Sequence, residues 1–197
     1  MNTATPRWPE QFSRPLVRLL RQPLVDSMLR LSAVEDLLSG LHPMLSLTEV
    51  RARVQRIDDE TADTKTIWLR PNALWRGAQA GQYVRLRAEI AGRRVERVYS
   101  LSSRPGDKLL AVTVKRQGLM SSHLHQQLKA GDVLTISQAM GDFVLPEALP
   151  PKLLMLSAGS GITPLMAMLR ALQQQGHAGR IDFVHLCRRP EELIFAT

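Results

Sequence analysis

Apolar and polar positions alternate along the middle of the chain in short segments that turn residues separate. Alternation over about four to eight residues is typical of half-buried β-strands. Six segments carry it, at residues 50–57, 64–70, 82–90, 94–103, 108–116 and 132–140. The turns fall at Pro71-Asn72, Gly81, Ala91-Gly92, Pro105-Gly106-Asp107 and Gly131-Asp132. This pattern predicts an antiparallel barrel or sandwich.

The pattern changes on both sides of these strands. Over residues 11–45 apolar residues recur at helical spacing between prolines, which predicts one or two short helices that stop at Gly40. Inside the barrel region, residues 121–131 predict one helix, capped by Ser121 or Ser122 and stopped by Gly131.

After a proline-rich joint, the chain takes on a βαβ pattern. An apolar strand, a helix, a second strand and a helix start are predicted at residues 153–158, 164–176, 181–187 and 190–195. The predicted fold is therefore mainly β plus α/β. It has a helical extension over 1–45, an antiparallel barrel over 46–149 and a partial parallel α/β domain over 150–197.

Composition narrows the class of protein. Of 197 residues, 44% are hydrophobic, enough to bury a core, and a single cysteine excludes a disulfide framework. No apolar run reaches the ~20 residues that cross a bilayer, and the polar start is no signal peptide. We expect a cytoplasmic protein. Cys187 is the last residue of the strand predicted over 181–187, which we expect to be buried, so its side chain would pack in the core.

The positive charge is concentrated in one segment. Residues 51–118 hold fifteen Lys and Arg against seven Asp and Glu, whereas residues 1–50 and 119–197 are each neutral. Such an excess favours an anionic ligand or an acidic partner, although a solvated basic face without a partner is the alternative. The segment lacks the interleaved aromatics, zinc spacing or helix-turn-helix of nucleic-acid binders, so we expect no nucleic-acid partner.

Two motifs carry candidate chemistry. In SAGSGITPLM, residues 157–166, a glycine turn joins a strand to a helix, where backbone N–H groups and the helix dipole can hold a phosphate. In RVYSLSS, residues 97–103, alternation places Arg97 and Tyr99 on one face of a strand. Arg can bind phosphate, Tyr can stack on a flat ring and Ser can donate to a ring nitrogen. Taken singly, each motif also fits a purely structural turn or strand.

In order and separation these motifs resemble the ferredoxin–NADP reductase family of flavoproteins. The family's R-x-Y-S pattern stands at residues 97–100, with GQYVRL at 81–86 before it and VKRQGLMSSHL at 114–124 after it. GDVLTISQAMGDFVL, AGSGITP and CRRPEELIF follow in the family's order, with Ala80 and Ala139 in place of usual prolines. The resemblance covers residues 47–197.

The resemblance implies an FAD-binding barrel, with FMN as the alternative flavin, and NADPH or NADH as substrate. It implies that Tyr99, Ser100 and Thr163 lie at the reacting rings and that no metal is bound. The implied flavin ligands are Arg97, Tyr99, Ser100, Lys115, Gly118, Met120 and Ser121. The implied nucleotide ligands are Gly159, Gly161, Ile162, Thr163, Pro164, Arg188 and Arg189, the two arginines favouring a 2′-phosphate. His123 and His125 are expected on a helix surface.

Two features bear on the chain's extent. The α/β part holds about one βαβ unit, which predicts a nucleotide domain that is truncated.

The N-terminal extension resembles that of reductases serving oxygenases and desaturases. Its residues 14–30 carry four Arg against Asp26, and packing on the barrel is favoured over docking on a membrane surface.

The resemblance therefore implies a reductase that passes electrons from NAD(P)H through FAD to an acidic, ferredoxin-type iron–sulfur carrier or domain of an oxygenase or desaturase. The alternative is a non-catalytic flavin-binding subunit for electron transfer.

Overall fold

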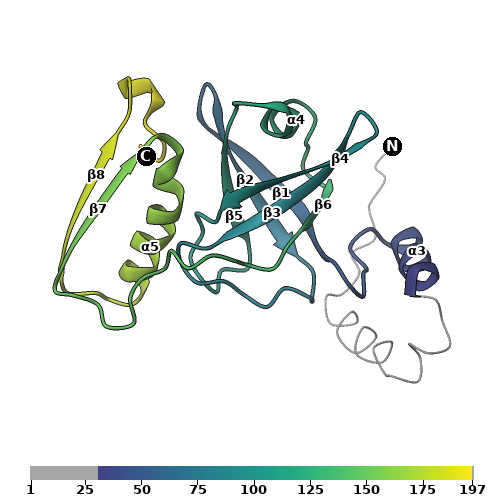
Figure 1. The fold of residues 1–197 in the computed structure, drawn as a ribbon, viewed down its shortest axis with the longest axis horizontal. Coiled ribbons are helices and arrows are strands. Elements are labelled where there is room, and N and C mark those ends of the chain that lie inside the picture. Colours follow the sequence, from purple (N-terminus) through teal and green to yellow (C-terminus); the bar gives the residue numbers. More distant parts are fainter. Residues whose placement is uncertain (1–30, 197) are drawn as a thin grey trace, which may run out of the picture.

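The structure is a computed structural model that describes residues 31–196. Figure 1 shows three parts along its longest axis, with helix α3 (Leu31–Leu41) at one end, a β-barrel in the middle and an α/β unit at the other end. The helices predicted before residue 31, and the basic segment 14–30, lie outside the described residues. Helix α3 ends at Leu41, one residue beyond the predicted stop at Gly40.

Six strands form one antiparallel sheet. They are β1 (Val50–Thr61), β2 (Thr64–Pro71), β3 (Tyr83–Ile90), β4 (Arg93–Ser100), β5 (Leu110–Lys115) and β6 (Val133–Ile136). Their order in the sheet is β4-β3-β6-β1-β2-β5. The two edge strands meet where Leu101 bridges to Val112 and the Ser102 amide donates to the Ala111 carbonyl over 2.8 Å. This contact closes the predicted barrel.

The alternation read from the sequence explains which side chains fill the barrel. Its core cluster is made of the apolar residues that alternate inward along the strands, among them Val54, Ile67, Leu69, Val84 and Leu86. The turn between β3 and β4 places Ala91 at φ 51° and Gly92 at φ 73°. Two residues with positive φ give the tight hairpin whose twist matches that of the strands.

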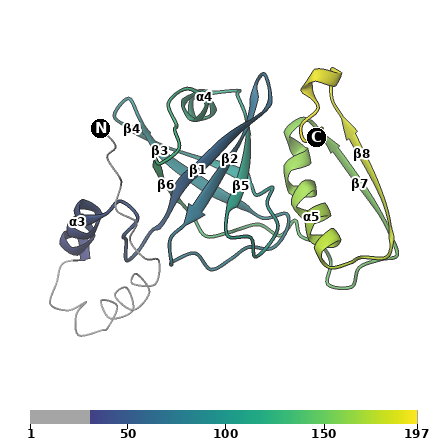
Figure 2. The same ribbon diagram turned by 180° about the vertical axis from the view of Figure 1, so that it is seen from behind.

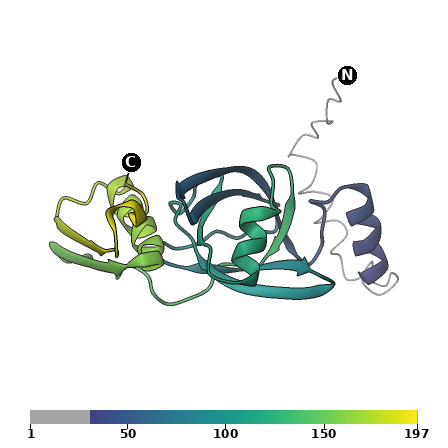
Figure 3. The same ribbon diagram turned by 90° about the horizontal axis from the view of Figure 1, so that it is seen from above.

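Helix α4 (Leu119–Gln126) covers the upper end of the barrel in the view of Figure 1, and Figure 3 shows it from above. Met120 and Leu124 point into the barrel core, because both belong to its buried cluster. The helix contacts β3 and β4. Its start and end differ from the sequence prediction. Its N-cap is Gly118, three residues before Ser121, and it ends at Gln126 before Gly131 is reached.

The α/β unit consists of β7 (Lys152–Ala158), the single turn η2 (Gly159–Gly161), α5 (Ile162–Gln174), β8 (Arg180–Leu186) and the single turn η3 (Pro190–Glu192). β7 and β8 pair in parallel, as expected of a βαβ unit. Figure 2 shows α5 on the face of these strands that looks toward the barrel. On the opposite face Leu154, Leu156 and Leu186 are exposed.

Two expectations for this unit were wrong. The helix expected over 190–195 is one 3₁₀ turn, because Leu193 already has the extended ψ of 110°. Cys187 is exposed rather than buried, because β8 ends at Leu186 and α5 covers one face of the strands.

The barrel and the α/β unit are in direct contact. Ala80, which precedes β3, belongs to the core cluster of α5 and β7. Arg170 of α5 donates from Nη1 to the Ser102 carbonyl over 2.6 Å and stacks on the Phe195 ring at 5.2 Å. Burial lowers the pKa of this guanidinium below its ordinary value, and it stays charged at neutral pH.

Helix α3 is fastened to the barrel by one apolar and one charged side chain. Leu38 is buried, and Glu35 accepts from the Leu47 amide over 2.9 Å. The other Glu35 oxygen lies 3.6 Å from Arg51 at the start of β1.

Candidate functional site

Strand β4 carries the first predicted motif. Arg97 and Tyr99 pair directly with Leu86 and Val84 of β3, and both of these apolar residues are fully buried. Directly paired residues of antiparallel strands share one face of the sheet. Arg97 and Tyr99 therefore lie on the inner side of the sheet, while Val98 between them is 59% exposed. The alternation predicted from RVYS is present.

The two side chains differ in what holds them. The Tyr99 ring packs against the barrel core, and burial raises the pKa of its hydroxyl while the nearby Arg97 charge opposes that shift. Arg97 is exposed and donates from Nη1 to the Glu96 carbonyl over 2.8 Å. Among residues 31–196 no carboxylate forms an ion pair with Arg97. Its charge is thus available to an anion.

Two neighbouring arginines of β3 on the outer side of the sheet are neutralised. Arg87 Nε lies 2.6 Å from Glu96, and its Nη1 lies 3.3 Å from Glu49. Arg85 is 3.3 Å from the same Glu96 carboxylate. Hydrogen bonding from Arg87 and the charges of both arginines hold the pKa of Glu96 below its ordinary value.

The turn before helix α4, residues 116–118, is fixed at each successive amide; we call it the α4 turn. Arg116 N donates to the Asp63 carbonyl over 2.8 Å, and Gln117 N and Gly118 N both donate to Ser121 Oγ over 2.9 Å. Ser121 donates in return to the Gly118 carbonyl. The Ser121 hydroxyl, predicted to meet a phosphate, is therefore engaged in shaping the turn.

Lys115, the last residue of β5, is held by two carboxylates. Its Nζ lies 3.1 Å from Glu192 of η3 and 3.3 Å from Asp63 in the turn between β1 and β2. The hydrogen bond to Glu192, together with that to Asp63, raises the pKa of Lys115 against the effect of burial. Burial would raise the pKa of Asp63, but hydrogen bonds from Thr61, Thr64 and Lys115 hold it below its ordinary value.

The predicted nucleotide turn has the geometry of a strand-to-helix junction. Gly159 has φ 51°, a left-handed conformation that glycine adopts without strain, and Gly161 is the N-cap of α5. Ile162 and Thr163 are buried in the first turn, and Thr163 Oγ1 donates to the Ser160 carbonyl over 2.9 Å. Pro164 stands at the third helical position, where its missing N–H interrupts no intrahelical bond.

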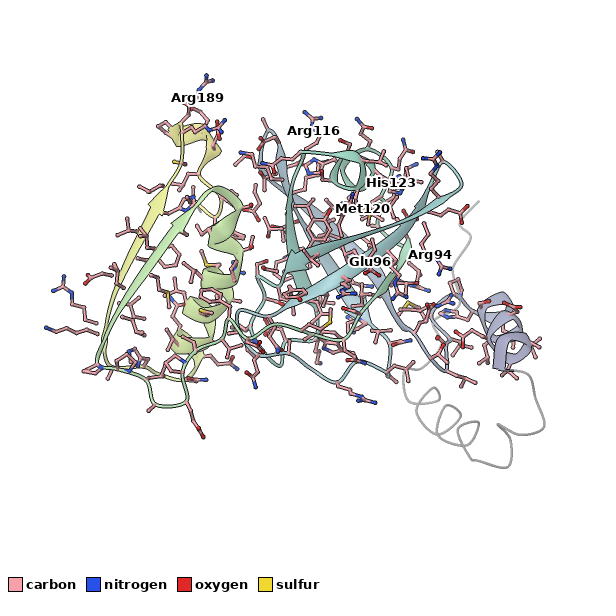
Figure 4. All side chains as sticks on the ribbon, viewed as in Figure 1. Arg94, Glu96, Arg116, Met120, His123 and Arg189 are labelled. Carbon is pink, nitrogen blue, oxygen red and sulfur yellow. The ribbon has the colours of Figure 1, made fainter. Side chains whose placement is uncertain are left out.

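The carboxyl ends of β7 and β8 carry the remaining predicted residues. Arg188 and Arg189 follow β8 and are exposed. Beside them Ser157 Oγ and His185 Nδ1 lie 2.8 Å apart and join the two strands. Figure 4 shows Arg189 and Arg116 at the upper edge of the two units, on the side where α4 begins.

The structure thus brings the predicted residues into two groups, one on β4 and the α4 turn and one on the α/β unit. Lys115 and Glu192 connect them. Sequence reasoning missed Asp63, Arg170 and Glu192, all of which act through partners far away in the chain. The sequence did offer a signal for Arg170, because it is a lone arginine among the apolar residues of the α5 pattern. No comparable signal marks Asp63 or Glu192.

Two clefts flank these groups. One of about 490 Å³ lies between the β1–β2 turn and α4, lined by Asp59, Thr61, Ala62, Lys65, Arg116, His125 and Gln126. The other, of about 480 Å³, lies between the barrel and α5, lined by Trp68, Ser103, Arg104, Asp107, Arg170, Gln173 and Gln174. Tyr99 and the glycine turn line neither of these two clefts.

Within the described part of the chain, no three His, Cys, Asp or Glu side chains are grouped to hold a metal ion. His125 instead makes a 2.8 Å hydrogen bond from Nε2 to the Val114 carbonyl. No helix between residues 31 and 196 is long and apolar enough to cross a membrane.

Comparison with known proteins adds family information to this geometry. Residues 52–145 match the oxidoreductase FAD-binding domain family, and residues 155–197 match the oxidoreductase NAD-binding domain family. Among solved structures, the FAD/NAD-binding domain of nitric oxide dioxygenase from Vibrio cholerae is similar, with a TM-score of 0.69 and 30% identity. The match covers 76% of this chain and 67% of that one.

Two curated relatives are similar in sequence. An NADPH oxidoreductase of Mycobacterium tuberculosis is 37% identical over 79% of this chain and 42% of its own length. The reductase subunit of glycine betaine monooxygenase from Chromohalobacter salexigens is 35% identical over 73% of this chain and 40% of its own. The chain thus spans less than half the length of these two relatives.

Proposed function

Because this chain belongs to the ferredoxin–NADP reductase-like oxidoreductases, in which an FAD-binding domain precedes a NAD-binding domain, we propose that it is a flavin-dependent reductase. In this proposal it takes electrons from NAD(P)H onto FAD and passes them to an iron–sulfur carrier that serves an oxygenase or desaturase. The observation that carries the proposal is the pairing of an un-neutralised Arg97 with the half-buried Tyr99 ring on one face of β4.

The residues of the barrel fit a flavin. The Arg97 guanidinium offers paired donors of the geometry that phosphate accepts. Tyr99 presents an aromatic ring whose rear is supported by the core, so it can stack without rearrangement. Ser100 is the last residue of β4 and lies on the Val98 face by the same alternation, so its hydroxyl would donate to the flavin ring where the ring passes the end of the strand. The first-turn amides of α4, at Met120 and Ser121, would complete the phosphate site.

The nucleotide would lie on the α/β unit. The glycine turn, with Gly159, Gly161 and Ile162, would let the backbone approach a diphosphate, and Thr163 and Pro164 would fix the first turn of α5 under it. Arg188 and Arg189 would bind a 2′-phosphate, which favours NADPH over NADH. The chain's task is to hold the two rings in contact and to exclude water; FAD, when bound, supplies the conversion of a hydride into single electrons.

The partner is proposed from charge and from one relative. The Chromohalobacter relative is named as the reductase subunit of a monooxygenase, which supports an oxygenase as the recipient. The excess of positive charge lies in residues 51–118, the segment that forms most of the barrel. An acidic, ferredoxin-type carrier would be attracted to this surface.

Flavin binding tests the proposal directly. The purified chain should be yellow and retain FAD, and Arg97→Ala should weaken FAD binding by about 2–4 kcal/mol, the scale for losing one partner of a charged pair. Tyr99→Ala should alter the bound flavin's absorption more than Tyr99→Phe, because stacking needs the ring and not the hydroxyl. Equal FAD affinity in wild type and Arg97→Ala would contradict the assignment.

Reduction by the nucleotide separates a reductase from a passive carrier. Anaerobic mixing with NADPH should bleach the visible absorption of the bound flavin, and stopped-flow spectroscopy measures this change. A chain that binds FAD without bleaching would be a flavin-binding subunit for electron transfer, and the reductase proposal would be rejected.

A further inference from the structure

Lys115 forms an ion-pair link between the barrel and the α/β unit, since its two carboxylate partners lie one on each. Asp63 belongs to the turn between β1 and β2, and Glu192 belongs to η3. The Lys115 side chain is 16% exposed and that of Glu192 is 31% exposed. Water therefore screens this pair less than a fully exposed one. A salt bridge in this setting can hold two segments in register.

On the barrel side, Asp63 holds Lys115 and the residue after it. Its carboxylate oxygen Oδ2 pairs with Lys115 Nζ, and its carbonyl accepts from the Arg116 amide over 2.8 Å. The other carboxylate oxygen is fixed by the hydroxyls of Thr61 and Thr64, each at 2.9 Å. Movement of Lys115 would therefore be transmitted to Arg116, the first residue of the α4 turn.

On the α/β side, Glu192 closes a short turn. Its amide donates to the Arg189 carbonyl over 3.0 Å, and Leu193 N donates to the Pro190 carbonyl over 3.1 Å. The turn follows directly on Arg188 and Arg189, which are proposed to bind the nucleotide. Lys115 thus connects η3, which follows the proposed nucleotide-binding arginines, with the α4 turn, which precedes the proposed flavin-phosphate site.

We propose that Lys115 is a positioning residue that couples the α4 turn to the η3 turn through its two carboxylate partners. This role rests on the proposed function for its purpose, but the coupling itself belongs to the chain alone. The resemblance implies Lys115 as a flavin ligand, but because its Nζ is held by Asp63 and Glu192, we place its effect on the flavin through the α4 turn and not through direct contact. The Arg170 contact to Ser102 keeps the two units joined when this link is removed, so the expected change is local.

The test uses the isosteric variant Glu192→Gln, which removes one charge on the α/β side and leaves the barrel unchanged. Glu191→Gln is the matched control, because Glu191 is the exposed neighbour in the same turn and forms no ion pair within residues 31–196. Amide hydrogen exchange, followed by NMR on the purified chain, reports local opening. We expect exchange at Leu193 and at Arg116 to rise about threefold to tenfold in Glu192→Gln and to stay unchanged in Glu191→Gln.

Flavin affinity and rescue separate positioning from simple stabilisation. The dissociation constant for FAD, from fluorescence quenching, should rise about threefold to fivefold in Glu192→Gln although residue 192 lies outside the barrel. Lys115→Met should raise the exchange rates and the FAD dissociation constant in the same way. Lys115→Arg should leave both at their wild-type values, since arginine keeps the charge and the reach of lysine.

Several results would overturn the inference. Faster exchange at Leu193 with unchanged Arg116 would mean that the link fastens η3 alone. Faster exchange at both amides with unchanged FAD affinity would mean a structural contact without influence on the flavin. Lys115→Arg behaving like Lys115→Met would exclude the ionic mechanism. A wild-type chain that takes up no FAD would contradict the proposed function, while exchange at Arg116 would still decide the coupling.

Discussion

Gly81 should tolerate alanine far less well than a glycine of the same backbone conformation elsewhere in the barrel. It precedes β3 with φ 100°, and a Cβ there would collide with the Phe143 carbonyl oxygen and the Met168 methyl group. Gly131, before β6, has φ 99° with no atom within 4 Å of the same Cβ. The two substitutions therefore share the backbone strain and differ in the steric contact.

The expected magnitudes follow from this difference. An alanine held at positive φ costs about 1–2 kcal/mol, which applies to both variants. The collision at Gly81 adds about 1–3 kcal/mol, the usual penalty for overpacking, because the Phe143 backbone has to move. Gly131→Ala should thus lose about 1–2 kcal/mol and Gly81→Ala about 2–5 kcal/mol of unfolding free energy.

Urea unfolding measures the two losses. Trp68 and Trp75 lie in the barrel, so their fluorescence reports its unfolding. With a slope of about 2 kcal/mol per molar urea, the midpoint of Gly81→Ala should lie about 0.5–1.5 M below that of Gly131→Ala. Equal midpoints at equal slopes would refute the close packing of Gly81 against Phe143 and Met168.

Three further predictions concern charge. The folded pKa of Asp63 lies below its unfolded value, so its ionised carboxylate stabilises the fold above about pH 4, and this stability is lost as the pH falls through the folded pKa. The difference in unfolding free energy between wild type and Asp63→Asn, measured from urea midpoints, should therefore shrink between roughly pH 6 and pH 3. A gap independent of pH would contradict this. The rate of electron transfer from the reduced flavin to an acidic ferredoxin-type carrier, by stopped-flow, should fall steeply as ionic strength rises; a rate independent of salt would remove the proposed steering. Arg188→Ala combined with Arg189→Ala should raise the dissociation constant for NADPH and leave that for NADH nearly unchanged, by fluorescence titration; equal effects would make these arginines ordinary surface charge.

Local patterns predicted the strands and most turns of the barrel because its side chains alternate with a period of two. Ile67 and Leu69 are buried where the alternation requires it. The start of α4 was misjudged for a chemical reason. A serine near a helix start is usually the N-cap, but Ser121 sits three residues inside and reaches back to the Gly118 amide. Sequence spacing alone does not distinguish these two positions.

The contacts between the units could not be predicted from the sequence. Lys115 and Glu192 are far apart in the chain, and no sequence pattern around either residue indicates that they pair. The exposure of Cys187 shows a related limit. The strand IDFVHLC has the apolar pattern of a strand covered on both faces, whereas α5 covers only one face of β8 among the described residues. The apolar pattern of a strand shows which of its faces could be buried, whereas the neighbouring helices and strands determine which faces are covered.

The strand order of the barrel also determines when it can close during synthesis. Strand β1 pairs with β2, its neighbour in the chain, and with β6, so that Val50 meets Ile136. At about 5–20 residues per second, a ribosome needs roughly 4–17 seconds to advance from the first of these residues to the second. During that interval one edge of β1 has no partner strand and is open to association with other nascent chains. The β7–β8 pair closes over a much shorter stretch of chain, so the barrel is the part whose folding depends on the pace of translation.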